Sequence, residues 1–331
     1  MTGDRLSLQH NVGRVIAGKY ELRELAGEGG MATVWRARMY GAAGFSREVA
    51  VKKMKAEFRA IKNYIDMFVE EARVGSDLQH PNIVQVYDFC QDDEKSYYLV
   101  MEWVDGVDFG SFVRAFRAQG HPIPWPLVAA IGVGVLRGLA AAHERRGPTG
   151  QPAPVIHRDV SPQNILLRRD GIVKLSDFGL ARAMDRIHSL TAPGTVKGKL
   201  SYLAPEITMG RSATVLSDLF SAGSVLWEGL AGAPLFDGER DVDVFAKIRR
   251  GEVRPIEQVR PDVPVALAQV VHRALAVAPR ERFPSARQMA NELASVLATV
   301  QSPTDAQTLL GRAVDCARQW LGGARSTARP R

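Results

Sequence analysis

The sequence is poor in cysteine, with two among 331 residues, and it lacks a long apolar run. Cys90 and Cys316 lie far apart, so they provide neither a disulfide framework nor the paired ligands of a zinc site, and a reducing, cytoplasmic setting is expected. The most apolar stretch, 127–136, is half as long as the ~20 residues that a membrane helix requires, and Arg137 follows it. The first 14 residues have no apolar core of the kind a secretory signal needs. We therefore expect no transmembrane segment in this chain and no export.

The chain also lacks a strong excess of one charge. Its net charge is +7, from 43 Lys and Arg against 36 Asp and Glu, and the two signs are interspersed. A solvated basic surface accounts for this balance, so no nucleic-acid partner is predicted. With 46% hydrophobic and 24% charged residues, the chain is long enough for one large or two modest domains with a buried core.

The periodicity of the chain changes near the turn signal Asp105-Gly106. Before it, β-rich runs at 33–37, 48–54 and 97–102 surround one helical stretch at 64–78. After it, helices are expected at 109–118, 126–143, 217–231, 242–249, 265–276 and 285–298. We therefore divide the chain into an N-terminal segment (1–19), a small α+β lobe (20–103), a larger helical lobe (104–300) and a C-terminal part (301–331).

The C-terminal part is predicted to contain an amphipathic helix followed by a basic, mobile tail at 322–331. Ser302 and Pro303 give an N-cap and first-turn signal. Apolar residues then recur on one face: Leu309, Leu310, Ala313, Val314, Ala317, Trp320 and Leu321. Such a face predicts docking on a partner or self-association.

A glycine-rich stretch lies between two strand-like runs. It comprises Gly27, Glu28, Gly29, Gly30, Met31, Ala32, Thr33 and Val34. Bare backbone there can close over phosphates and present N–H donors. Taken alone, however, glycines between strands most often make a simple hairpin turn.

A lysine and a glutamate supply the context for this loop. Lys52 ends the strand-like run Val49-Ala50-Val51-Lys52 and can place a cation against the α- and β-phosphates of a nucleotide. Glu71, within the helical stretch, is placed to hold Lys52 as an ion pair. The alternative is an exposed lysine and a glutamate on a solvated helix face.

The most specific signal is a pair of polar motifs, His157-Arg158-Asp159-Val160-Ser161-Pro162-Gln163-Asn164 and Ser176-Asp177-Phe178-Gly179. Phosphoryl transfer builds negative charge on the γ-phosphate and needs divalent cations held by oxygen ligands, which Asn164 and Asp177 can supply. Asp159 can then accept the proton of the substrate hydroxyl.

These motifs, in this order and at this spacing, resemble the eukaryotic-like (Hanks-type) serine/threonine protein kinases of bacteria over about residues 20–298. Further segments extend the resemblance: His80-Pro81-Asn82-Ile83-Val84, Met101-Glu102-Trp103-Val104, Ala204-Pro205-Glu206, Asp218-Leu219-Phe220-Ser221-Ala222-Gly223 and Arg282. The resemblance implies an α+β, bilobal protein-kinase fold, with a small β-rich N-lobe that carries one main helix and a larger, mostly helical C-lobe. It also implies transfer of the γ-phosphoryl group of ATP to serine or threonine hydroxyls of protein substrates in bacterial signalling.

The resemblance also assigns residues to the nucleotide and its metal. The metal is expected to be Mg²⁺, with Mn²⁺ as the alternative. The implied nucleotide contacts are Gly27, Glu28, Gly29, Gly30, Met31, Val34, Ala50, Lys52, the gatekeeper Met101, Glu102, Val104, Asp108 and Leu166. For Asp108, an acidic helix N-cap is an equal interpretation of a contact with ribose. Glu206 is expected to pair with Arg282, and Asp218 to anchor the catalytic loop.

Two positions depart from the family pattern. Ser161 stands where serine/threonine kinases carry a lysine, and Lys199 stands where they carry a threonine. Our hypothesis is a reciprocal exchange, in which Lys199 supplies the cation near Asp159 and Ser161 supplies the hydroxyl. The alternative is a solvent-facing Lys199 and a crippled enzyme.

The loop between Asp177 and Glu206 contains Ser189, Thr191 and Thr195, of which Thr191 and Thr195 are the favoured sites of regulatory autophosphorylation. The alternative is that these hydroxyls only cap turns.

Three rival functions remain on the sequence alone. The stretch Gly13–Tyr20 approaches a P-loop, but Tyr20 replaces the Ser or Thr that would bind magnesium. A pseudokinase that binds nucleotide or partners without turnover is motivated by Ser161 and Lys199. A small-molecule phosphotransferase of related fold is disfavoured by Ala204-Pro205-Glu206 and its preceding loop, which suit a peptide substrate.

Overall fold

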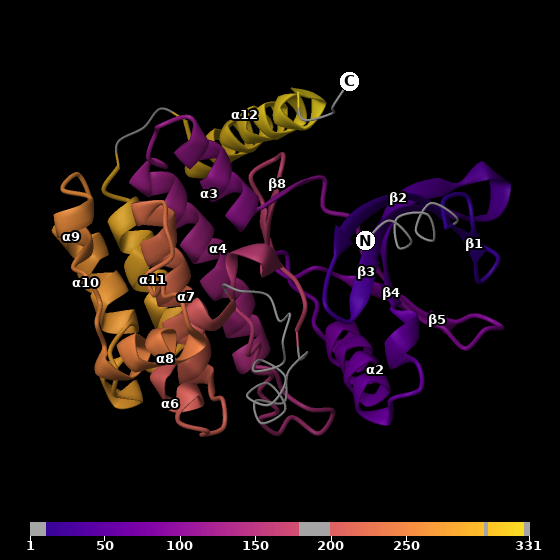
Figure 1. Ribbon diagram of the computed structural model, residues 1–331, viewed down its shortest axis with the longest axis horizontal. Coiled ribbons are helices and arrows are strands. Elements are labelled where there is room, and N and C mark those ends of the chain that lie inside the picture. Colours follow the sequence, from indigo (N-terminus) through magenta and orange to yellow (C-terminus); the bar gives the residue numbers. More distant parts are fainter. Residues whose placement is uncertain (1–10, 179–198, 301–303, 328–331) are drawn as a thin grey trace. The chain divides into compact units, whose positions relative to one another are not determined.

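The computed structural model describes residues 11–178, 199–300 and 304–327, and the chain divides into two compact units (Figure 1). Unit 1 runs to Gln79 and resumes from Val84 to Val104. Unit 2 contains His80–Ile83 and the chain from Asp105 onward. The short segment His80–Ile83 therefore groups with the helical unit, although it precedes the last strands of unit 1.

Unit 1 is a six-stranded antiparallel sheet with one main helix. Its strands are β1 (Val15–Ile16), β2 (Tyr20–Glu28), β3 (Ala32–Tyr40), β4 (Ser46–Met54), β5 (Val86–Gln91) and β6 (Tyr97–Glu102). They pair in the order β1-β2-β3-β4-β6-β5, and the helix is α2 (Lys62–Asp77). Short 3₁₀ turns lie at η1 (Ala42–Gly44) and η2 (Ala56–Phe58).

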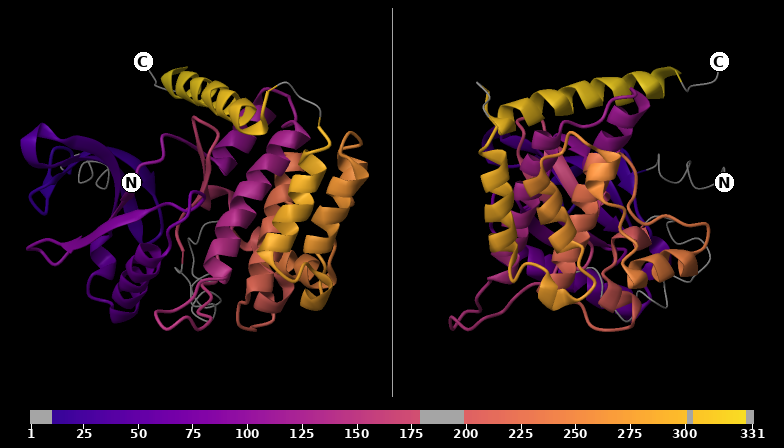
Figure 2. Two further views of the ribbon diagram at one scale, coloured as in Figure 1. Left: turned by 180° about the vertical axis from the view of Figure 1, so that it is seen from behind. Right: turned by 90° about the vertical axis from the view of Figure 1, so that its left-hand side faces the viewer.

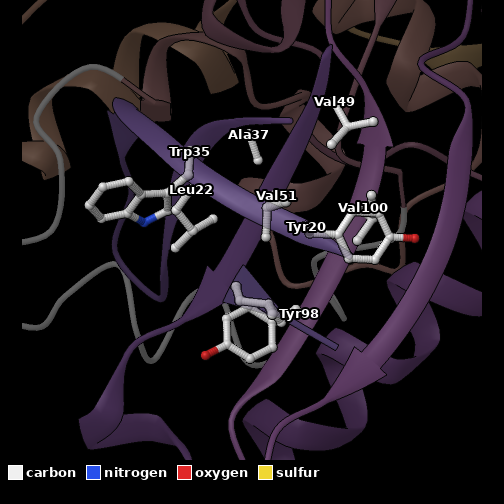
Figure 3. Close-up of a cluster of buried hydrophobic side chains, with 9 residues drawn as sticks. Tyr20, Leu22, Trp35, Ala37, Val49, Val51, Tyr98 and Val100 are labelled. Atoms are coloured by element: carbon white, nitrogen blue, oxygen red, sulfur yellow. The ribbon is translucent and has the colours of Figure 1, made fainter. Parts of the chain in front are cut away.

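The sheet of unit 1 carries a hydrophobic cluster on one face (Figure 3). Helix α2 packs against the sheet through a second cluster. Alternate residues of β3 point to the same face, so Trp35 and Ala37 are both buried there. Residues from four other strands complete the first cluster: Ile16, Tyr20, Leu22, Val49, Val51, Tyr98 and Val100. The second cluster joins Phe68 and Ala72 of α2 to Met54 and Leu99 of the sheet. The packing of α2 on β4 and β6 fixes where its polar residues lie.

Unit 2 is mostly helical and includes a small three-stranded sheet (Figure 2). Its strands are β7 (Gly106–Asp108), β8 (Ile165–Arg168) and β9 (Val173–Leu175), paired antiparallel in that order. Its helices are α3 (Phe109–Ala118), α4 (Trp125–His143), α6 (Pro205–Thr208), α7 (Val215–Ala231), α8 (Asp241–Arg250), α9 (Ile256–Val259), α10 (Val265–Ala274), α11 (Ala286–Leu297) and α12 (Ala306–Thr327). Its 3₁₀ turns are η3 (Pro162–Asn164), η4 (Lys199–Tyr202) and η5 (Pro279–Glu281).

The centre of unit 2 is α4, which is buried on nearly all sides. Gly138 lets it approach the segment His80–Ile83, because a Cβ there would lie 2.8 Å from the carbonyl oxygen of Asn82. Among the residues that the structure describes, α4 is also the one helix long and apolar enough to cross a membrane, and 72% of its apolar stretch is buried within the protein. Burial on this scale is that of a core helix, and the helix continues past Arg137, where the sequence suggested that the apolar stretch closes.

The helix predictions are confirmed within two residues at most boundaries, but the C-terminal prediction needs correction. Helix α12 begins at Ala306 and is capped by Asp305, which accepts the N–H of Thr308, rather than by Ser302, which lies outside the described residues. Helix α12 also runs to Thr327, so the prediction of a mobile tail was wrong for 322–327. The apolar face of α12 docks on unit 2 of the same chain, where Val314 is fully buried.

Candidate active site

Unit 1 contains the predicted ion pair between Lys52 and Glu71. The Lys52 Nζ lies 2.6 Å from Glu71 Oε1, and both side chains are less than a tenth exposed. Lys52 is on β4 and Glu71 is on α2, so the packing of helix on sheet sets their separation. Two charges buried together favour each other strongly and are costly to separate. The solvated alternative for this pair is therefore wrong.

The glycine-rich stretch forms the tip of the hairpin between β2 and β3. Gly27 and Glu28 end β2, and Gly29 donates its N–H to the carbonyl of Ala32 at 2.8 Å. The simple hairpin-turn interpretation is thus correct for the local structure. A Cβ at Gly27 or Gly30 would meet no atom within 4 Å, and these glycines have no positive φ. Neither packing nor backbone strain explains why glycine is present here.

The other nucleotide contacts predicted in unit 1 lie on its central strands. Ala50 on β4 pairs in register with Met101 on β6, and both are buried. Val34 on β3 is opposite Lys52 and half-buried. Glu102 donates its N–H to the carbonyl of Gln85 at 2.8 Å, which fixes the end of β6. Met31, Glu28 and Val104 lie in partly or fully exposed positions. Their roles in nucleotide binding stay predictions.

Unit 2 brings together the three polar residues predicted for catalysis and metal binding. Asn164 ends η3 directly before β8, and Asp177 follows β9 by two residues. Because β8 and β9 are paired, Ser176 donates its N–H to the Asn164 carbonyl at 2.9 Å. Asn164 Nδ2 in turn donates to the Asp159 carbonyl at 2.8 Å. A continuous chain of hydrogen bonds therefore links the three segments.

The loop predicted to be catalytic is held by a buried aspartate of α7. Asp218 accepts the N–H groups of His157 and Arg158 at 2.8 Å each, as the sequence predicted. Arg158 has φ +68° and Asp177 has φ +61°, a region that non-glycine residues seldom occupy. Such backbone strain persists only where the surroundings fix it, and it is concentrated at functional sites. The bonds to Asp218 supply that restraint for Arg158.

His157 is a supporting residue to which the sequence analysis gave no role, although it lies within the motif. Its Nδ1 accepts the N–H of Asp159 at 3.1 Å, and its Nε2 lies 2.9 Å from the Ser176 carbonyl. This arrangement requires a neutral ring with the proton on Nε2. Complete burial lowers the pKa of His157, against the opposing effect of Asp218, so the ring stays neutral. The His157 ring also packs on the ring of Phe178, and the two ring centroids are 4.5 Å apart.

Two buried pairs hold the segment around Ala204-Pro205-Glu206. Arg282 makes a bidentate pair with Glu206, each contact 2.8 Å, which confirms the predicted partnership. The arginine neighbour lowers the pKa of Glu206 despite its burial. Tyr202 donates its hydroxyl to Glu228 at 2.5 Å, a contact that the sequence analysis missed because Glu228 carries no motif. Burial raises the pKa of Glu228.

Other predicted residues of unit 2 have separate outcomes. Asp108 caps α3 by accepting the Ser111 N–H at 2.8 Å, so the N-cap interpretation is confirmed and the ribose contact stays a prediction. Leu166 is half-buried on β8, opposite Asp108. Ser161 is buried, and within the described ranges its Oγ has no hydrogen-bond partner.

Four further predicted residues are not placed as side chains. Lys199 begins η4, but its side chain lies outside the described part of the structure. Ser189, Thr191 and Thr195 also lie outside the described residues. The exchange hypothesis and the phosphorylation sites stay predictions.

The residues of unit 2 fit a divalent cation that also takes ligands from its substrate. Among the residues that the structure describes, no three His, Cys, Asp or Glu side chains gather as a metal cluster. Magnesium in nucleotide sites typically needs only one or two protein oxygens beside the phosphates. Because Asn164 uses its amide nitrogen toward Asp159, the oxygen of the same amide is the atom that would bind a cation together with the Asp177 carboxylate.

Comparison with known proteins identifies this arrangement. Residues 20–293 match the family model described as protein kinase domain. The chain belongs to the protein kinase family. It is 37% identical over 292 residues to the tyrosine-protein kinase MasK of Myxococcus xanthus, covering 88% of this chain and 45% of that protein. It is 33% identical to the serine/threonine-protein kinase PrkC of Bacillus subtilis, covering 84% of this chain and 40% of that protein.

The solved structures agree with the fold. The kinase domain of Mycobacterium tuberculosis PknI superposes with a TM-score of 0.63 at 27% identity, covering 86% of this chain and 98% of that one. The protein-kinase fold predicted from the motifs is therefore confirmed. The chain spans less than half the length of MasK and PrkC.

Proposed function

We propose that this chain is an active protein kinase that transfers the γ-phosphoryl group of ATP to hydroxyl groups of proteins, with a divalent cation. The observation that carries the proposal is the complete set of polar residues in kinase-like order, each held by specific contacts. Unit 1 supplies the buried Lys52–Glu71 pair, and unit 2 supplies Asp159, Asn164 and Asp177 linked by hydrogen bonds.

The proposed roles follow from the chemistry of these groups. Lys52, oriented by Glu71, provides an ammonium for the phosphates. The hairpin glycines keep side chains away from the phosphates, while the N–H of Gly29 holds the hairpin by bonding the Ala32 carbonyl. When bound, the cation neutralises charge that develops on the transferred phosphoryl group. Asp159 orients the substrate hydroxyl and accepts its proton. Catalysis of this kind is positioning plus electrostatic stabilisation.

We propose serine and threonine as the acceptor residues. The names of the relatives differ on this point, since PrkC is named a serine/threonine kinase and MasK a tyrosine kinase. The catalytic loop of this chain, Asp159 to Asn164, lacks the Ala-Ala-Arg pattern typical of tyrosine kinases. We further propose Mg²⁺ as the metal, cytoplasmic action, and autophosphorylation at Thr191 or Thr195.

The experiment is phosphate transfer from Mg-ATP to a generic protein substrate, followed by phosphoamino-acid analysis, with Asp177→Ala as control. Phosphoserine or phosphothreonine in the wild-type reaction, absent from the control, supports the proposal. If phosphotyrosine is the only product, the chain has the tyrosine specificity named for MasK, and the proposal of serine and threonine acceptors is wrong. No phosphate in either reaction would leave the pseudokinase alternative, a scaffold that binds nucleotide or partners.

We also propose that Lys199 replaces the lysine absent from the catalytic loop. The support is indirect: Ser161 is 1% exposed, and its hydroxyl has no partner within the described ranges, which suits a group that pairs with a residue beyond them. The backbone that follows Lys199 is fixed, because Ser221 donates its hydroxyl to the Tyr202 carbonyl at 2.7 Å.

A further inference from the structure

The C-terminal helix α12 lies against the small sheet of unit 2 (Figures 1 and 2). Its contacts are with α3, α4, β7 and β8. Leu310, Val314 and Ala317 on one face are each at most 1% exposed. Burial of these apolar side chains drives the docking, because apolar surface removed from water stabilises a contact in proportion to its area.

Two glycines bring the backbone of α12 onto the turn between β8 and β9. A Cβ at Gly311 would lie 2.6 Å from the carbonyl oxygen of Arg169, and a Cβ at Gly171 would lie 1.9 Å from the carbonyl oxygen of Gln307. Gly171 also has φ +78°, which other residues rarely adopt. Gln307 donates its side-chain amide to the Asp170 carbonyl at 3.1 Å. The helix is therefore fitted to this turn at backbone distance.

Charged residues join the same helix to the turn and to the start of β7. Arg169 contacts Asp315 of α12 at 2.6 Å, and Arg318 of α12 contacts Asp105 at 2.8 Å. Arg169 also lies 3.6 Å from Asp105 and donates its N–H to the Asp105 carbonyl at 3.0 Å. These side chains are about half exposed, so each pair alone contributes little to stability. Together they fix the direction in which Asp105 leads into β7.

The opposite end of the same sheet carries predicted site residues. In register, Gly106 is opposite Arg168 near the turn, whereas Asp108 is opposite Leu166. Asn164 directly precedes β8. β7 and β8 are pressed together, because a Cβ at Gly106 would lie 1.8 Å from the Leu167 carbonyl oxygen. A shift of the turn is thus transmitted along strands only three or four residues long.

We infer that α12 is a positioning element for nucleotide binding, which acts through Asp105, Arg169 and the β8–β9 turn on the strands that bear Asp108 and Leu166. The inference rests on the proposed function. Asp159 is held mainly by other segments, by His157 and by Asp218 of α7 through its neighbours, and it receives one further hydrogen bond from Asn164, which precedes β8. We therefore expect displacement of α12 to weaken ATP binding more than it slows the chemical step.

The test compares two glycine substitutions on α12. Gly311→Val drives a side chain into the β8–β9 turn, whereas Gly322→Val is the matched control, because a Cβ at Gly322 meets no atom within 4 Å. Both exchanges favour the helix equally by propensity. We expect Gly311→Val to raise the KM for Mg-ATP about fivefold with kcat within about twofold, and Gly322→Val to change neither. Amide hydrogen exchange of α12 reports whether the helix has been displaced.

The outcomes separate this inference from the proposed function. A wild-type chain that transfers no phosphate refutes the kinase proposal itself. If the wild type is active, a variant with a displaced α12 but an unchanged KM for Mg-ATP refutes the positioning role. A variant in which only kcat falls refutes it as well. Should Gly311→Val remain docked or fail to fold, a charge in the buried face of α12 provides the decision: Val314, which is fully buried, is replaced in Val314→Asp, and this variant is expected to displace the helix and raise the KM. A displaced helix with an unchanged KM in Val314→Asp would also refute the inference.

Discussion

The two units hold their charged site residues by different means. In unit 1, Lys52 and Glu71 extend from regular elements, a strand and a helix, and meet as buried side chains. In unit 2, Asp159 and Asp177 lie on loops, and the bonds that fix these loops involve mainly backbone groups. The charge of Glu71 is thus coupled to the stability of its unit, whereas the Asp177 carboxylate accepts the hydroxyl of its neighbour Ser176 at 3.1 Å, a contact that an amide oxygen also makes.

The largest effect is expected from removing the charge of Asp177. Asparagine has the same shape and is among the residues that best tolerate φ near +61°, so Asp177→Asn removes the charge, exchanges one carboxylate oxygen for an amide NH₂ and leaves the backbone unstrained. We expect kcat to fall about 10³-fold, since the proposed ligand of the activating cation is weakened. The melting temperature is expected to stay within about 2 °C of the wild type. A fall of more than about 5 °C would show that unit 2 also depends on this charge for its stability.

Removing the charge of Glu71 tests the opposite half of the comparison. Glu71→Gln leaves the buried Lys52 ammonium without its carboxylate, so we expect a loss of about 3 kcal/mol in unfolding free energy and about 10² in kcat. Adding Lys52→Met removes the ammonium that has lost the Glu71 carboxylate. The double variant is therefore expected to recover most of the stability and none of the activity. Urea unfolding and phosphate transfer measure the two effects. A double variant as unstable as Glu71→Gln would contradict a coupling through charge.

A smaller effect is expected at Lys199. If this lysine replaces the missing catalytic-loop cation, Lys199→Met lowers kcat about tenfold and changes stability little. Lys62→Met, at an exposed position on α2, is the control and is expected to have no effect. Turnover within about threefold of the wild type in Lys199→Met, less than about 1 kcal/mol, would end the exchange hypothesis. That result would remove Lys199 from the proposed mechanism, in which Asp159 and Asp177 would then be the charged residues that unit 2 contributes.

Most of the fold and the site could be predicted from the sequence because helices and motifs carry strong local signals. The helix Phe109–Ala118 was predicted at its observed bounds, and the pairs Lys52–Glu71 and Glu206–Arg282 were expected. The strands β1, β5, β7, β8 and β9 were not identified. Four of these are two to four residues long, which is too short for an alternating pattern to show.

The errors at the C-terminus have a different origin. Ser302 was favoured as a cap by local chemistry, but the helix begins where Asp305 can cap it and Leu310 can be buried. Gly322 and Gly323 suggested a tail, yet the helix continues through them. The sequence also could not show what the apolar face of α12 packs against, because no local pattern predicts that Gly311 contacts the β8–β9 turn of the same chain. Tertiary contacts decide such cases against local propensity.

The smallest expected effect concerns how stability depends on pH. It tests whether a neutral His157 ring holds the Asp159 loop of unit 2. Burial lowers the pKa of His157 below its ordinary value of 6.5, so the unfolded chain binds a proton at this residue more readily than the folded protein. Stability from His157 is therefore complete above about pH 6.5 and is lost as the pH falls below it. His157→Phe keeps a ring against Phe178 but removes both hydrogen bonds. We therefore expect the variant to have a lower unfolding free energy than the wild type at pH 8. Between pH 6.5 and 5.5, its unfolding free energy is expected to decline less steeply than that of the wild type, by up to about 1 kcal/mol per pH unit. The pKa of His80 is also lowered by burial, but His80 is present in both proteins and cancels in the comparison. Equal slopes for the two proteins would mean that His157 accepts a proton in the folded state, and that the Asp159 loop is not held by a neutral imidazole.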